Sequence, residues 1–261
     1  MATNPFEKQT PIAGVKKIIA VASGKGGVGK STIATNLALA LRAYGSVGIL
    51  DADIYGPSIP RMMGALNQKP AVIANDQIEP VTRYGVKLMS IGFLVEEGAA
   101  VVWRGPMLFK AMDQFFRDVH WGDLDYLVID LPPGTGDVQL SLVQKVPVNA
   151  AVIVTTPQNI SLTDAKKAID MFERTGVKIA GVVENMAYMK NPVNGEKMAL
   201  FPKGEIDSYL QSKNIRKLAE VPFNPAVSLG SEAGVPLIES YSDSDEARAL
   251  QSLASQLREL V

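Results

Sequence analysis

Apolar runs and helical patterns alternate along almost the whole chain. The clearest apolar runs predict strands at residues 17–23, 47–51, 126–130, 150–155 and 179–184. Several of these runs are apolar at nearly every position, which is typical of parallel strands that are buried on both faces. Between the runs, apolar residues recur at helical spacing. The pattern therefore predicts an α/β protein with a doubly wound, mostly parallel β-sheet and helices on both faces.

Two segments interrupt this alternation. Within residues 70–98, short strand-like pieces at 71–73, 77–80 and 86–91 predict a small antiparallel β insertion. Residues 186–204 are rich in Met, Asn, Pro, Gly and Lys, and they predict a long irregular loop of the kind that often carries function.

The two ends of the chain differ in their patterns. Residues 1–14 are expected to form an N-terminal extension to a single domain that spans residues 1–261. At the other end, Asp243 and Glu246 predict a capping box, followed by a helix whose leucines form one apolar stripe. Because this helix starts acidic and carries mixed charge, we expect it to pack on its own domain.

The first predicted strand leads into the sequence GKGGVGKST, which matches the phosphate-binding pattern G-x-x-x-x-G-K-[ST]. Its glycines allow consecutive backbone N–H groups to turn towards phosphate oxygens. We expect Lys30 to reach the β- and γ-phosphates of a nucleotide and Ser31 to bind Mg²⁺. The predicted nucleotide-binding residues of this loop are Gly24, Lys25, Gly26, Gly27, Val28, Gly29, Lys30, Ser31 and Thr32.

Acidic residues follow two further predicted strands. Asp130 precedes LPPGTGD, and we expect it to be a catalytic residue that holds a water on Mg²⁺. In DADIYGPS, Asp53 is the predicted residue that orients the attacking water near the metal. Asp51, Asp53, Gly134 and Asp137 are predicted to form a switch that responds to loss of the γ-phosphate. Ordinary turn or helix capping is the alternative for each of these aspartates.

Three residues after later strands are candidates for contacts with the base. Asn185 ends a strand, and its amide can hydrogen-bond the edge of adenine with both of its polar groups. The alternative for Asn185 is an ordinary turn residue. Pro222 and Phe223 follow another strand and are predicted to flank the base.

Composition removes several classes of function. A net charge of −1 gives no electrostatic case for binding nucleic acid or an anionic membrane, so neither is expected as a partner. The chain has no cysteine, which excludes disulfides and thiolate-held metal within one chain. Its one histidine, His120, is expected to be structural or at the surface. No signal-peptide core or membrane-length apolar run is present, so we expect a cytoplasmic protein.

The motifs occur in a specific order. Lys25 lies inside the phosphate loop, and DADIYGPS, VVWRGPM, WGDLDYLVIDLPPGTGD, TTPQ and ENM follow it. On these motifs the chain resembles the Mrp/ApbC family, which are ATPases of the deviant-Walker class together with MinD/ParA proteins and the nitrogenase iron protein. The resemblance covers residues 15–236. It implies a P-loop NTPase fold, slow Mg²⁺-dependent ATP hydrolysis and a homodimer in which Lys25 stabilises the transferring phosphate on the partner's nucleotide.

The resemblance also implies a role in iron–sulfur protein assembly, with apo iron–sulfur clients or assembly proteins as partners. Family members are described as carrying a 4Fe–4S cluster between two subunits on a Cys-Pro-x-Cys-Gly segment. Here that segment reads Asn-Pro-Val-Asn-Gly, with Asn191 and Asn194 at the cysteine positions. A neutral amide is a poor ligand for such a cluster, so no iron–sulfur ligands are expected in this chain. A MinD/ParA-like ATP-driven spatial regulator or interaction switch is the alternative function.

Overall fold

The computed structural model describes residues 9–54, 56–94 and 105–261, without the side chains at 105, 106, 108, 109 and 137. Within these residues one sheet contains eight strands: β1 (Val15–Ala22), β2 (Val47–Asp51), β5 (Val81–Arg83), β6 (Val86–Ser90), β7 (Leu124–Asp130), β8 (Ala150–Thr155), β9 (Ile179–Asn185) and β12 (Lys217–Val221). Their order across the sheet is β12-β9-β8-β1-β7-β2-β6-β5, and all neighbours are parallel except β5 and β6. The predicted doubly wound, mostly parallel sheet is confirmed.

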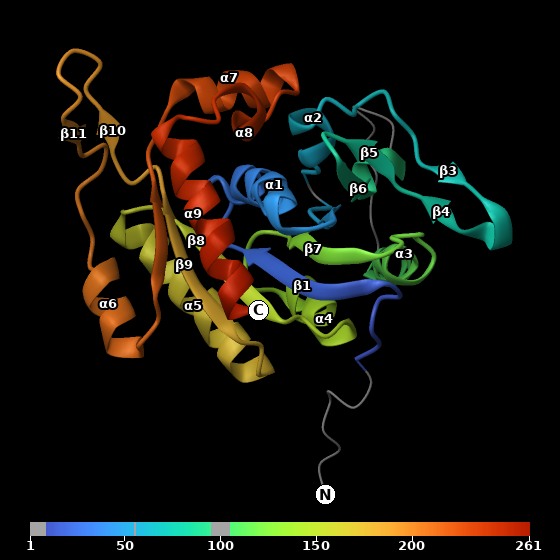
Figure 1. Cartoon of the computed structure of the whole chain (residues 1–261). Helices are drawn as coiled ribbons and strands as arrows, with labels where there is room; N and C mark the ends of the chain where they lie inside the picture. The colour runs from blue at the N-terminus through green and yellow to red at the C-terminus, as the bar shows by residue number, and fades with distance from the viewer. Residues whose placement is uncertain (1–8, 55, 95–104) are drawn as a thin grey trace, which may run out of the picture.

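Helices cover both faces of this sheet (Figure 1). One face packs against α1 (Lys30–Leu41), α2 (Ile59–Met62), α8 (Leu237–Ser240) and α9 (Asp245–Leu260), with α7 (Pro225–Ala233) beside α2. The other face packs against α3 (Gly105–Arg117), α4 (Asp137–Lys145), α5 (Asn159–Thr175) and α6 (Ile206–Lys213). Short 3-10 turns lie at Arg42–Tyr44, Ala74–Asp76 and Ile91–Leu94. The apolar residues therefore form two buried layers, one on each side of the strands.

The segment predicted as an antiparallel insertion divides into two parts. The strands β3 (Ala71–Val72) and β4 (Ile78–Glu79) pair antiparallel in a small sheet of their own. The piece predicted at 86–91 is different, because β6 belongs to the main sheet and runs parallel to β2. Val86, Leu88 and Met89 are fully buried, which is the environment of a covered parallel strand. The assignment of this piece to the insertion was wrong, and residues 95–98 lie outside the described residues.

The segment 186–204 contains a short hairpin. Its strands β10 (Met189–Lys190) and β11 (Lys197–Met198) pair antiparallel, with an exposed tip between them. The prediction of an irregular loop therefore fails at these four residues. The rest of the segment has no regular secondary structure, and the hairpin projects outward above α6 in the view of Figure 1.

The last helix differs from its prediction at its first turn. The hydroxyl of Ser244 caps α9 by accepting a hydrogen bond from the backbone N–H of Ala247 at 3.1 Å, so the cap is not Asp243. The predicted packing is confirmed, because Leu250, Leu253 and Leu257 are buried in the layer that contains α1.

Truncation of this stripe is expected to destabilise the whole domain. Leu253→Ala removes a side chain that is completely buried, so the free energy of unfolding should fall by about 2–5 kcal/mol in a urea titration. The control is Glu259→Ala on the exposed side of the same helix, which should change it by less than about 0.5 kcal/mol. Equal effects of the two substitutions would contradict the packing of α9.

Candidate functional site

The parallel strands bring the predicted site residues to one edge of the sheet. Asp130 at the end of β7 lies level with Val21 of β1 on one side and with Asp51 of β2 on the other. At the far side of the sheet, Asn185 ends β9 level with Val221 of β12. The phosphate loop follows β1 at this same edge, which is where open α/β sheets bind their ligands.

A cavity of about 200 Å³ opens over the phosphate loop. It brings together Lys25, Lys30, Ser31 and Asp53, as the sequence predicted. Gly29, with φ of 83°, adopts the left-handed conformation just before α1, so the helix starts at Lys30 and its free N–H groups lie beside the cavity. The full lining is Ser23, Lys25, Gly26, Gly27, Gly29, Lys30, Ser31, Thr32, Asp53, Ser58, Met62 and Pro133.

Lys30 is the buried cation of this cavity. Its Nζ lies 2.7 Å from Asp130 Oδ1, 3.6 Å from Asp53 Oδ2 and 3.3 Å from the hydroxyl of Ser31. The Asp130 side chain is completely buried and that of Lys30 is 5% exposed. Within the described residues, Asp53 Oδ1 and Asp130 Oδ2 are buried without a hydrogen-bond partner. Two carboxylates thus face one lysine, and each retains an oxygen that can bind a further cation or water.

Asp51 fixes the loop that carries Asp53 by accepting hydrogen bonds from its backbone. Its Oδ1 accepts a hydrogen bond from the backbone N–H of Asp53 at 3.2 Å. Its Oδ2 accepts from the N–H of Ile59 at 3.2 Å and from the hydroxyl of Ser90 at 3.0 Å. Burial raises the pKa of Asp51 to about 7, and the charge of Asp130 acts in the same direction. Burial also raises the pKa of Asp130, although Lys30 opposes that shift.

A second cavity of about 300 Å³ adjoins the first and shares Gly29, Thr32 and Met62 with it. Asn185, Pro222 and Phe223 line this cavity. Asn185 Nδ2 donates to the carbonyl of Val28 at 2.9 Å, which leaves Oδ1 and one N–H for a ligand. A Cβ at Gly29 would lie 2.2 Å from Asn185 Nδ2, so the contact requires glycine there.

Gly24 and Gly134 are outside the cavity linings, but both lie close to them. A Cβ on Gly24 would lie 2.0 Å from the carbonyl oxygen of Asp164, so the start of the loop packs directly on α5. Gly134 donates its backbone N–H to the carbonyl of Ser23 at 3.0 Å. The side chain of Asp137 is outside the described part of the structure. His120 is exposed, as expected for a surface residue.

Several lining residues were missed at the sequence level. Ser58 and Met62 follow the DAD motif closely, and their proximity to it was the available signal. The residues of α7 carried no signal of this kind, because nothing in their sequence indicates that α7 folds over the end of β12. The unpredicted lining of the second cavity comprises Ile33, Met62, Met186, Val221, Asn224, Val227, Ser228, Ser231, Glu232, Leu237 and Leu250.

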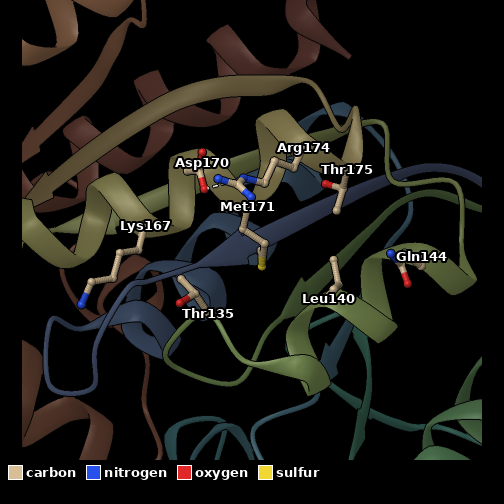
Figure 2. A pocket seen from close by; sticks show the side chains of 8 residues that line it. All are labelled: Thr135, Leu140, Gln144, Lys167, Asp170, Met171, Arg174 and Thr175. Atoms are coloured by element: carbon tan, nitrogen blue, oxygen red, sulfur yellow. Dashed lines mark ion pairs between the residues drawn. The ribbon is translucent and has the colours of Figure 1, made fainter. Parts of the chain in front are cut away.

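A third cavity, of about 460 Å³, lies between α4 and α5 (Figure 2). Leu140 from α4 and Met171 from α5 extend into the space between the helices, and Thr135 borders it from the loop after β7. At the surface, Arg174 Nε pairs with Asp170 Oδ2 at 2.7 Å. This cavity has no residue of the phosphate loop in its lining, but Thr135 belongs to the loop that was predicted to act as a switch.

Comparison with known proteins identifies the family. A family model of the ParA group, described as the NUBPL iron-transfer P-loop NTPase, matches residues 14–258. The chain belongs to this family. The resemblance inferred from the motifs is thus confirmed.

Individual relatives agree with the family. An iron-sulfur cluster carrier protein of Aquifex aeolicus is 46% identical over 259 residues, which cover 98% of this chain and 71% of that protein. The iron-sulfur cluster transfer protein NUBPL of Mus musculus is 48% identical, with coverage of 96% and 79%.

Solved structures extend the likeness to the fold. A nucleotide-binding protein of Archaeoglobus fulgidus, in complex with ADP, is 41% identical with a TM-score of 0.76, covering 88% of this chain and 90% of its own. The cell division ATPase MinD of Pyrococcus furiosus has a TM-score of 0.69 at 24% identity, with coverage of 94% and 99%, and shows the fold alone. No helix in the described residues is long and apolar enough to cross a membrane.

The pKa of Asp51 predicts how stability depends on pH. Between the usual value of 3.8 and the folded value of about 7, the folded chain binds a proton at Asp51 that the unfolded chain releases. Stability should therefore fall as pH rises through this window and level off above it. Asp51→Asn cannot ionise, so urea titrations from pH 4.5 to 8 should show a weaker decline than in the wild type. Identical declines would contradict the burial effect.

Proposed function

We propose that this chain is a Mg²⁺-dependent ATPase that acts as a homodimer in the assembly of iron–sulfur proteins. The observation that carries the proposal is the position of Lys30, buried at the base of the phosphate cavity between Asp130 and Asp53. Two relatives named as iron–sulfur cluster carrier or transfer proteins support the assembly role, and the ADP complex of a third supports the nucleotide.

The roles of the residues follow from their contacts. Nucleotide phosphates offer Lys30 a stronger anionic partner than Asp130, so their binding frees the Asp130 carboxylate to hold a metal-bound water. Asp53 is the proposed residue that orients the attacking water, and its unpaired Oδ1 supports this role. Asn185 Oδ1 can accept from the amino group of adenine, while Pro222 and Phe223 provide apolar contact in the adjoining cavity.

Mg²⁺ fits the chemistry of the phosphate cavity. Hard oxygen donors are available on Ser31, Asp53 and Asp130, and the unpaired carboxylate oxygens supply uncompensated negative charge. No group of three or more acidic or histidine side chains is assembled as a metal cage in the described residues. The ion would therefore be held chiefly by Ser31, water and the phosphates, and it would neutralise charge that develops on the transferring phosphoryl group.

Lys25 supports the dimer. It lines the phosphate cavity but is half-exposed, unlike the buried Lys30. A lysine that serves the nucleotide of a second subunit has to remain accessible from outside its own domain. A cation that arrives only in the assembled dimer would link hydrolysis to assembly.

The hairpin tip does not fit an iron–sulfur cluster. Asn191 Oδ1 accepts from the N–H of Val193 at 2.9 Å, and Asn194 Oδ1 accepts from the N–H of Glu196 at 3.0 Å. Asn194 Nδ2 also donates to Glu196 Oε2 at 2.8 Å. Both amides therefore stabilise the turn itself, where a cluster would require thiolates. The proposed role in assembly proceeds without a cluster bound to these residues.

Lys30→Ala is expected to abolish ATP binding, because the phosphate charge loses its buried cation. Isothermal titration with ATP and Mg²⁺ should show at least about a hundredfold weaker binding, in line with the loss of a charge-assisted contact worth about 3 kcal/mol. Turnover should disappear with it. Unchanged affinity would contradict the assignment of the phosphate cavity.

The matched control is Lys25→Ala, which removes a lysine from the same loop. It should bind ATP like the wild type but lose most of its turnover if Lys25 acts across the dimer. Mixing it with Lys30→Ala should restore partial activity, since each mixed dimer then keeps one intact site. Full activity of Lys25→Ala by itself would count against the dimer.

Anaerobic reconstitution with iron and sulfide tests the cluster. The wild type should retain no stable cluster, whereas the double variant Asn191→Cys/Asn194→Cys should retain iron and sulfide with a cluster absorption spectrum. The iron content per chain gives the stoichiometry. Stoichiometric iron in the wild type would contradict the reading of the two asparagines.

A further inference from the structure

One buried polar side chain near the site has no role in the proposed chemistry. Gln139 lies in the first turns of α4 and is 2% exposed. Its Nε2 donates to the carbonyl of Pro132 at 2.6 Å, while its Oε1 is buried with no hydrogen-bond partner in the described residues. A buried amide oxygen without a donor is costly, and such groups are rare in folded proteins. Such an exception calls for a functional explanation.

The partner of Gln139 belongs to the loop that follows Asp130. Pro132 and Pro133 have no backbone N–H, so this part of the loop cannot form its own ladder of hydrogen bonds. It is held from outside at two points, by Gln139 at the Pro132 carbonyl and by the bond from Gly134 to Ser23. Pro133, between these two points, lines the phosphate cavity. The hydrogen bond from Gln139 therefore helps to fix the position of Pro133 in the wall of that cavity.

We propose that Gln139 is a positioning residue for ATP hydrolysis, which holds the loop from Pro132 to Gly134 against the phosphate cavity. The inference rests on the proposed ATPase function and concerns only how the loop beside that site is held in position. Gln139 does not touch the phosphates itself and acts through the Pro132 carbonyl.

The surroundings of α4 leave this helix room to shift. The cavity of about 460 Å³ lies between α4 and α5, with Leu140 and Gln144 on the side of α4 and Thr135 at the end of the loop (Figure 2). Closely packed interiors resist displacement, whereas a helix beside an open cavity can shift without compressing its neighbours. Gln139 faces the core side of the same helix, so it couples the loop to an element that has room to move.

Gln139→Leu tests the proposal. Leucine keeps a similar volume but cannot hold the Pro132 carbonyl, so the kcat for ATP should fall about tenfold. The KM and the Kd for ATP should stay within about threefold, because the binding residues are intact. The melting temperature should change little, since the substitution removes an unpaired buried oxygen together with the hydrogen bond.

The matched control is Gln144→Leu on the same helix, at a half-exposed position in the α4–α5 cavity. It should leave kcat unchanged. A wild-type kcat in Gln139→Leu, an equal loss in Gln144→Leu, or a parallel loss of ATP affinity would overturn the positioning role while leaving the ATPase proposal intact. A wild-type chain that hydrolyses no ATP would overturn both.

Discussion

The buried contact between Lys30 and Asp130 is the constraint on which the site depends. Removing both charges from water costs several kcal/mol per ion unless each finds a partner, and here they lie 2.7 Å apart. The pairing requires that the loop after β1 and the end of β7 meet at one depth, which the parallel register of neighbouring strands ensures. Asp53 brings a second carboxylate to within 3.6 Å of the same lysine, so this buried cation faces two carboxylates.

Much of this arrangement follows from the sequence. The phosphate loop, DADIYGPS and DLPPGTGD each end an apolar strand, and parallel strands end at a common edge, so their proximity could be predicted without coordinates. The placement of β6 could not. Its apolar run is short and lies among turn residues. It pairs with the side of β2 that β7 leaves free, and only the folded sheet determines this pairing.

The cover of the second cavity was also beyond prediction. Residues of α7 reach it because Pro225–Ala233 packs against α2, and that contact is long-range and mediated partly by backbone. Gly64 and Gly234 approach so closely that a Cβ on Gly234 would lie 2.5 Å from the Cα of Gly64. Local sequence patterns do not indicate such a long-range contact. The cap of α9 was missed for a different reason. Asp243 and Ser244 are both residue types that favour an N-cap, and the geometry of the turn selects Ser244.

The hairpin tip has a practical consequence. Its turn is closed by the amides of Asn191 and Asn194, and no residue of the chain is a cysteine. Cysteine thiolates are readily oxidised in air. This chain contains no thiolate, so nucleotide-binding measurements on it need no protection of cysteine from air.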